Sequence, residues 1–288
     1  MNLTKKILGR FYDVPAIKFF FELFFVILPI AFVVRTFFFG LYQVPSGSME
    51  TTLLVGERFF ADKLSYWFRK PMRGEIIAIN APNYTFSTNP IVRLWEKYGS
   101  FKVENWTKRI IAIPGDHIKG VIEDGKAVVY LNGEKLDEPY VNKYPITQIE
   151  LPATSSSYSK DTPYALRSFD PSVSWQDQPF YKIDPKRLVL LPNGKPLVIW
   201  PEAGDRSKRD VFDIKLGENQ YWCQGDNRRG SDDSRVFGPF RGDMIHGRII
   251  FRIWSLDSDE SWWIAHLIKH PIDFWSRIRW SRCLQFVK

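Results

Sequence analysis

Cysteine and histidine are scarce in this chain, which holds two cysteines and four histidines among 288 residues. No Cys-x-x-Cys pair and no His-Glu-x-x-His motif occurs, which argues against a structural zinc site and against the commonest zinc proteases. No Gly-x-Ser-x-Gly motif surrounds a serine, so a Ser-His-Asp hydrolase also has little support. We expect no metal and no cofactor. The sequence does not decide whether Cys223 and Cys283 pair.

The net charge of +8 is concentrated at the two ends of the chain. Residues 1–18 hold four basic residues and one acidic residue, and residues 264–288 hold five basic residues and one acidic residue. A nucleic-acid-binding domain usually spreads its basic residues over the folded module, so we expect no nucleic-acid partner. Basic ends suit anionic lipid headgroups better, and we expect membrane lipids as partners.

The chain has one long apolar segment, at residues 19–41. As a helix it would span about 34 Å, enough to cross the hydrocarbon core of a bilayer. Glu22 and Arg35 interrupt it near its ends, where both side chains could reach an interface. A cleaved signal peptide and a buried core helix are the alternatives, but no Ala-x-Ala follows the segment and it is apolar on every face. We expect a transmembrane anchor.

The charges that flank this segment predict its orientation. Basic residues before it favour a cytoplasmic location for residues 1–18, which places the chain after the anchor outside the cytoplasmic (inner) membrane. We therefore predict a single-pass protein with an extracytoplasmic body.

The body reads as mainly β and antiparallel, because short strand-like runs alternate with turn residues and no βαβ rhythm appears. Residues 83–106 and 140–185 are poorer in strand signal. The expected strands are 58–62, 75–80, 109–113, 127–131, 188–191, 197–200, 220–224 and 247–254.

The last segment, residues 255–288, is basic and rich in tryptophan. Its apolar runs are too short for a second span, and their spacing from Ser261 allows an amphipathic helix that breaks near Pro271. Two locations stay open for this helix: the membrane surface, or the surface of the body.

Ser48 and Lys108 are candidates for a nucleophile and its base. Ser48 lies seven residues beyond the apolar segment, between Pro45 and Gly47 on one side and Met49 on the other. Lys108 opens an apolar run that continues as Ile110 to Ile113. A lysine acts as a base only when its pKa falls from about 10.4 to near 7–8, which needs about 4 kcal/mol of differential solvation through burial.

Five motifs, taken in order, resemble those of type I signal peptidases. They are PSGSM at 45–49, GERFFADKLSY at 56–66, RGEIIAI at 73–79, TKRIIAIPGD at 107–116 and GDNRRGSDDSR at 225–235, and RTFFF at 35–39 is also usual in that family. The resemblance covers about residues 19–132 and 218–254. It implies a catalytic β core at 42–132 and 218–254, with an inserted variable lobe at 133–217.

The resemblance implies a membrane-bound serine endopeptidase that removes signal peptides from preproteins with a Ser-Lys dyad. Ser48 would be the nucleophile and Lys108 its general base, while Ser46 would serve the oxyanion and Ser231 would orient the lysine. Residues expected to support the site are Met49, Arg109, Asp226, Arg228, Asp233 and Arg235. Two departures from the family pattern, Thr51 and Gly230, affect loop shape but carry no catalytic atom.

Two rival functions are weighed against this one. A membrane-tethered β-rich binding protein would use the same serine and lysine only structurally. A self-cleaving repressor-type peptidase would carry a DNA-binding domain and no anchor, and no helix-turn-helix pattern precedes the body.

Overall fold

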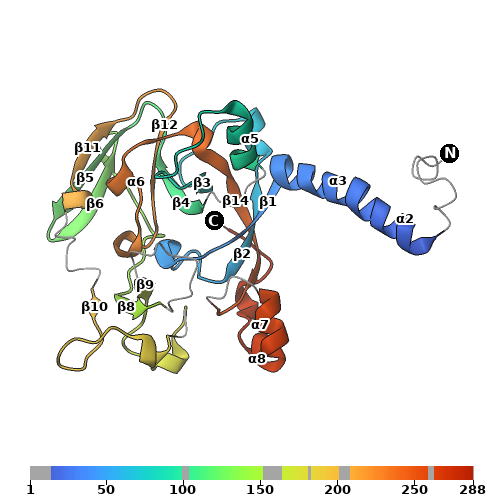
Figure 1. Ribbon diagram of the computed structural model, residues 1–288. Coiled ribbons are helices and arrows are strands. Elements are labelled where there is room, and N and C mark those ends of the chain that lie inside the picture. Colours follow the sequence, from blue (N-terminus) through green and yellow to red (C-terminus); the bar gives the residue numbers. More distant parts are fainter. Residues whose placement is uncertain are drawn as a thin grey trace.

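The computed structural model describes residues 14–98, 104–151, 164–180, 183–200, 208–258 and 263–287. A β-rich body is joined to one long helix that projects away from it (Figure 1). The mainly β, antiparallel fold expected from the sequence is confirmed.

The projecting helix runs from Pro15 to Phe38 and is the one helix among the described residues that is long and apolar enough to cross a membrane. It starts four residues before the expected anchor and ends three residues before its expected end. The early end has a simple cause, because Phe39 already pairs with Asp62 in the sheet. Its segments are α2 (Pro15–Glu22), η2 (Leu23–Ile27), α3 (Leu28–Val33) and η3 (Val34–Phe38).

The main sheet has eight strands in the order β1-β2-β14-β3-β4-β12-β13, with β15 paired to β14, and every pairing is antiparallel. It brings together segments that are distant in sequence, since β4 lies between β3 and β12. The strands are β1 (Phe39–Gln43), β2 (Glu57–Asp62), β3 (Ile76–Asn80), β4 (Asn105–Ala112), β12 (Gln220–Gln224), β13 (Phe240–Arg241), β14 (Ile245–Ser255) and β15 (Gln285–Phe286).

Two smaller sheets complete the body. One has the order β11-β5-β6-β7 and the other β10-β8-β9. The first takes β7 and β11 from the expected lobe 133–217, so the expected boundaries fall within this sheet. The strands are β5 (His117–Glu123), β6 (Lys126–Leu131), β7 (Glu134–Lys135), β8 (Ile146–Glu150), β9 (Tyr164–Ser168), β10 (Val198–Ile199) and β11 (Phe212–Lys215).

Two local expectations need correction, and a third, that residues 83–106 are poor in strands, agrees with the structure. The segment 140–185, expected to be poor in strands, contains β8 and β9, which pair with each other. Their polar residues hide the alternation of apolar and polar residues that would have marked them as strands. The expected strand at 188–191 forms only isolated bridges, because Pro185–Arg187 is a helical turn and Pro192 follows. The segment 83–106 contains α5 and the start of β4.

Short helical segments connect these strands. They are η4 (Gly47–Met49), α4 (Ser65–Phe68), α5 (Pro90–Tyr98), η5 (Trp175–Asp177), η6 (Pro185–Arg187), η7 (Lys208–Asp210), η8 (Arg228–Gly230), α6 (Ser234–Phe237), η9 (Gly242–Met244) and η10 (Trp280–Arg282). The tail adds α7 (Trp263–Lys269) and α8 (Pro271–Ser276), which meet at the predicted break near Pro271.

The end of the tail packs on the body. Phe274 is buried, Ile278 bridges to Leu256, and β15 extends the main sheet. Ile268 and Ile272 remain largely exposed on α7 and α8. The tail therefore rests on the body and still presents apolar side chains on its surface.

A buried carboxylate fastens this tail to the core. Glu57 ion-pairs with Arg282 of the tail at 2.6 Å and with Arg252 of β14 at 3.0 Å. It also accepts a hydrogen bond from the Leu54 amide at 2.9 Å. Because Glu57 is fully buried, both arginines depend on it for charge compensation.

Glu57→Ala is expected to lower the free energy of unfolding by about 3–5 kcal/mol, because two largely buried arginines lose their partner. Chemical unfolding of the detergent-solubilised full chain measures this, with the exposed Glu218→Ala as the matched control. A loss no larger than that of the control would contradict the role of Glu57.

Candidate active site

The loop that carries Ser48 joins β1 to β2 and is held at both ends. The Val44 amide donates to the Glu57 carbonyl at 2.9 Å, and the Leu53 amide donates to the Met49 carbonyl at 2.9 Å. Met49 is fully buried in a core cluster that also contains Phe59 of β2. Packing of Met49 thus fixes the backbone on one side of Ser48.

Gly47 is required by close packing on the other side of Ser48. A Cβ added there would lie 2.8 Å from the carbonyl oxygen of Leu166 in β9. The side chain of Asn227 donates to the Gly47 carbonyl at 2.9 Å, and the Asn227 amide donates to the Ser48 carbonyl at 3.1 Å. The loop is therefore wedged between β9 and the segment 225–235.

Lys108 reaches Ser48 from β4. Its Nζ lies 3.0 Å from Ser48 Oγ, and the two residues are 4% and 7% exposed. The ring of Trp106, two residues earlier on the same strand face, has its centroid 5.6 Å from Nζ. Burial lowers the pKa of the Lys108 amine, and this effect exceeds the opposing charge of Asp233.

The two other predicted serines lie in the same cavity, of about 530 Å³. Ser46 Oγ is 3.4 Å from Ser48 Oγ. The Ser231 hydroxyl is buried and hydrogen-bonds to no group of the described residues, so the predicted bond to Lys108 is not formed in this structure. Its orienting role stays a prediction.

Arg109 and Asp226 form a buried two-pronged ion pair, with nitrogen–oxygen distances of 2.9 and 2.8 Å. Asp226 also accepts a hydrogen bond from Thr52, in the loop that carries Ser48, at 2.6 Å. The Arg109 guanidinium lies over the ring of Tyr140, 4.1 Å from its centroid. This pair links β4, the loop and the segment 225–235 behind the Ser48–Lys108 contact.

Asp233 and Arg235 form a second buried ion pair, at 2.9 Å. Arg235 also pairs with Asp210 at 2.6 Å. Burial alone would raise the pKa of the Asp233 carboxyl, but the hydrogen bonds and charge of Arg235 hold that pKa below its usual range. Asp233 and Arg235, both expected to support the site, are thus paired with each other.

The side chain of Arg228 is engaged with another part of the chain. It ion-pairs with Glu138 and donates to the Gly225 carbonyl at 3.2 Å. Arg228 therefore connects the segment 225–235 to the residues that follow β7.

Sequence reasoning missed Glu50, which is fully buried two residues after Ser48. Its carboxylate accepts a hydrogen bond from the Ser168 amide of β9 at 2.8 Å. Burial raises the pKa of Glu50, and the charge of Arg167 opposes this only in part. Glu138 and Asp210, the partners of Arg228 and Arg235, were also missed, because their pairing depends on folding and no local motif marks it.

The structure assembles no metal site or disulfide among the residues that it describes. Among the residues that the structure describes, no group of three or more His, Cys, Asp or Glu could hold a metal ion. Cys223 and Cys283 are free thiols, and burial raises the pKa of Cys223 to about 12. The reactive groups brought together are a hydroxyl and an amine of lowered pKa, which is the arrangement of an activated nucleophile.

Comparison with known proteins identifies the family of the chain. The family model described as "Signal peptidase, peptidase S26" matches residues 17–254. Signal peptidase I of Buchnera aphidicola subsp. Schizaphis graminum is 28% identical over 246 residues, covering 81% of this chain and 74% of that protein. Signal peptidase IB of Staphylococcus aureus is 28% identical over 226 residues, covering 78% and 83%.

A crystal structure of a signal peptidase I from Enterococcus faecalis V583 aligns at 20% identity and a TM-score of 0.28, covering 63% of this chain and 97% of that one. That score is too low to bear on the fold. The family match does not depend on this structure, and it extends over more than half of the chain. The chain therefore belongs to the signal peptidase family S26, whose members named above are type I signal peptidases, and it is a serine peptidase.

Proposed function

We propose that this protein removes signal peptides from exported preproteins with Ser48 as nucleophile and Lys108 as general base. The observation that carries the proposal is the 3.0 Å contact between Ser48 Oγ and Lys108 Nζ, two residues that are both buried. Membership of the signal peptidase family supports the substrate class.

The reaction is an acyl transfer in two halves. Ser48 Oγ attacks the carbonyl carbon of the scissile bond as neutral Lys108 takes its proton, and the ammonium then protonates the departing amine. A water molecule next attacks the acyl-serine, losing its proton to Lys108, and the serine leaves with that proton. In this scheme the Ser48 amide and the Ser46 hydroxyl, whose Oγ lies 3.4 Å from Ser48 Oγ, would serve the oxyanion in both halves.

Lys108 must be neutral at working pH for this scheme. Burial of the amine works in this direction, because it disfavours the charged form and lowers the pKa of Lys108 below the ordinary lysine value. The nearby carboxylate of Asp233 favours the charged form of Lys108, but the ion pair with Arg235 partly neutralises this carboxylate. The Asp233–Arg235 ion pair thus weakens the effect by which Asp233 would keep Lys108 protonated.

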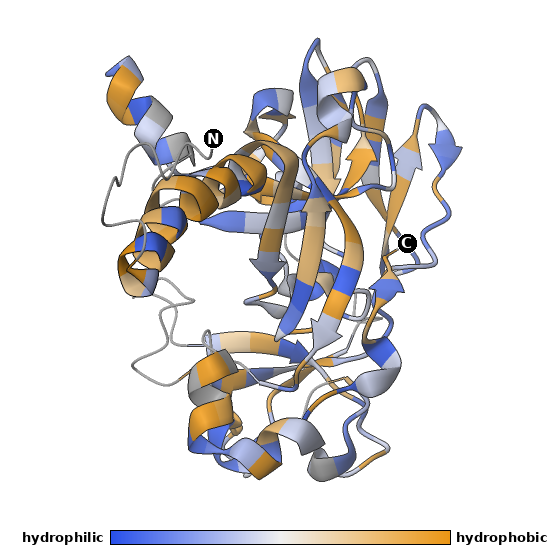
Figure 2. Cartoon of the chain, turned by 90° about the vertical axis from the view of Figure 1, so that its right-hand side faces the viewer, coloured by the Kyte–Doolittle hydropathy of each residue, from blue (hydrophilic) through white to orange (hydrophobic). Residues whose placement is uncertain are grey.

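The helix Pro15–Phe38 is proposed to hold the enzyme in the cytoplasmic membrane, with the body outside. Most of the basic residues on its inner side lie outside the described residues. Figure 2 looks onto the side of the body from which this mostly hydrophobic helix projects, and Figure 1 places α7 and α8 on that side. Their exposed Ile268, Ile272 and Trp275 are suited to contact lipid.

Membrane attachment serves catalysis by geometry. The apolar segment of a signal peptide lies in the same bilayer as the anchor, so the two partners meet at high effective concentration. The family resemblance adds a preference for small side chains at the first and third positions before the cut.

Ser48→Ala and Lys108→Met are each expected to lower preprotein processing by at least about 1,000-fold, because each removes one half of the nucleophile–base pair. The measurement is the rate of cleavage of a preprotein by full-length enzyme in vesicles. Ser172→Ala and Lys195→Gln, at exposed positions, are the matched controls. Substantial activity in either site variant, with folding intact by circular dichroism, would leave a non-catalytic membrane-tethered protein as the better account.

The lowered pKa of Lys108 also predicts how stability depends on pH. Between the folded-state pKa and the unfolded value of about 10.4, the unfolded chain binds one more proton than the folded chain at this residue. Stability therefore rises with pH in that window, by at most about 1.4 kcal/mol per unit.

Comparison of the wild type with Lys108→Met isolates this contribution. Denaturant unfolding at several pH values between 7 and about 10 should show the wild type gaining stability relative to the variant as pH rises. Parallel curves for the two proteins would mean that the folded and unfolded amines titrate alike.

A further inference from the structure

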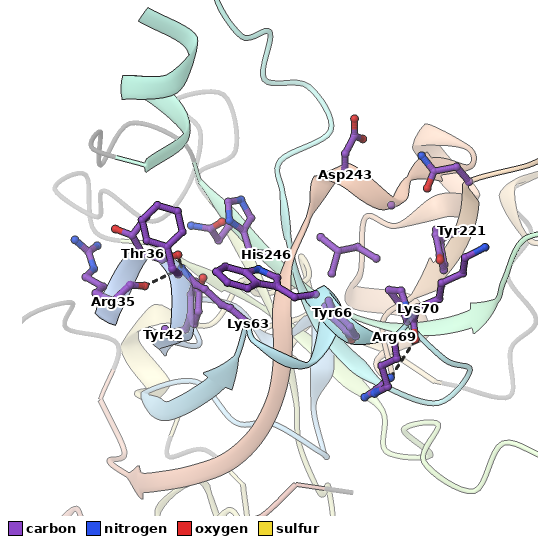
Figure 3. A pocket seen from close by; sticks show the side chains of 18 of the residues that line it. Arg35, Thr36, Tyr42, Lys63, Tyr66, Arg69, Lys70, Tyr221, Asp243 and His246 are labelled. Carbon is purple, nitrogen blue, oxygen red and sulfur yellow. Dashed lines mark hydrogen bonds between the residues drawn. The ribbon is translucent and has the colours of Figure 1, made fainter. Parts of the chain in front are cut away.

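A second cavity, of about 550 Å³, opens where the chain leaves the projecting helix. Its wall includes Arg35 and Thr36 from the end of that helix, Tyr42 from β1, and Lys63 just after β2. Figure 3 shows Arg35, Tyr42, Lys63 and His246 gathered at one end of the cavity. The proposed peptidase chemistry makes no use of this site.

Two basic residues, Arg35 and Lys63, line this end of the cavity. Lys63 Nζ donates to the carbonyl oxygens of Arg35 and Thr36, at 3.0 and 3.3 Å, so its ammonium is held against the last turn of the helix that carries Arg35. Burial lowers the pKa of Lys63, and the charge of Arg35 lowers it further. Like charges held together at a cavity wall favour an anionic ligand.

Nearby carboxylates are engaged elsewhere. Asp62 accepts hydrogen bonds from the amide and hydroxyl of Ser65 at the start of α4. Glu75 forms ion pairs with Arg69 at 2.5 Å and with Arg248 at 3.0 Å. Asp243 is the acidic residue in the described lining, and it pairs with Arg241 at 3.3 Å. Among the described lining residues, basic side chains therefore outnumber acidic ones.

Tyr42 adds a neutral donor beside these cations. Burial raises the pKa of its phenol to about 12, so the hydroxyl keeps its proton at physiological pH. Gly40 leaves room for this ring, because a Cβ there would lie 2.3 Å from it. A hydroxyl, an ammonium and a guanidinium together match the oxygens of a phosphodiester.

The surroundings point to a ligand that comes from the bilayer. Trp67 of α4 is 60% exposed and contacts Phe37 and Phe38 at the end of the helix, with ring centroids 6.3 and 6.1 Å apart. Phe68 is 81% exposed. Exposed aromatic rings beside basic groups at the end of a membrane-length helix are typical of the headgroup region.

We propose that this cavity binds the phosphate headgroup of one anionic phospholipid from the outer leaflet, through Arg35, Lys63 and Tyr42. The inference rests on the proposed membrane anchoring of the chain. The bound lipid would fix how the body sits on the bilayer, because Lys63 joins the helix end to β2.

The test titrates the detergent-solubilised full chain with phosphatidylglycerol and counts bound lipids by native mass spectrometry. Wild type should retain one lipid in preference to phosphatidylcholine. Lys63→Gln keeps a donor for the helix carbonyls but removes the charge, and should weaken binding by about tenfold. Arg35→Gln, which spares the Lys63 contacts, should do the same if Lys63→Gln folds poorly. Lys195→Gln, an exposed lysine outside the cavity, is the matched control and should bind as wild type.

Equal phosphatidylglycerol binding by all four proteins would overturn the proposal. Displacement of the lipid by millimolar inorganic phosphate would assign the site to free phosphate and overturn the lipid assignment. Flotation of the full chain with phosphatidylcholine vesicles tests anchoring separately. A chain that does not float contradicts the proposed anchor, whereas one that floats without a phosphatidylglycerol preference contradicts only the headgroup site.

Discussion

The contact between the Ser48 hydroxyl and the Lys108 amine is the interaction on which the proposed activity depends. Neither residue creates it alone. The loop 44–49 must be wedged against β9 by Gly47, β4 must carry the lysine inward, and the segment 225–235 must hold the loop through Asn227. Burial of the amine is a consequence of this three-part assembly, and the low pKa follows from burial.

The two buried aspartates of the segment 225–235 are each paired with an arginine. Asp226 is committed to Arg109, and Asp233 to Arg235, so each buried carboxylate is compensated within its own pair. An uncompensated carboxylate beside Lys108 would stabilise the ammonium and work against a neutral base. The same pairs tie together β4, the loop and the segment 225–235, so one set of contacts serves both packing and electrostatics.

The sequence indicated the long apolar helix and the β class, because local signals mark both of them. An apolar run marks the helix, and apolar stretches mark β2, β3 and β12. The site residues were predicted from order and motif, through the family resemblance.

What the sequence did not indicate depends on partners distant along the chain. Glu50 looks like an ordinary loop acid until β9 supplies the Ser168 amide. Glu138 and Asp210 gain their roles only when Arg228 and Arg235 reach them. The polar strands β8 and β9 are stabilised by each other and carry no strong alternation of their own.

The most direct test of the central claim is the pKa of Lys108 itself. Lysines labelled with ¹³C at Cε titrate visibly by NMR, and the Lys108 signal is the one that disappears in Lys108→Met. A midpoint well below about 10.4 is the result predicted for a buried amine beside Ser48. A midpoint at the ordinary lysine value in the folded protein would contradict the assignment of Lys108 as general base.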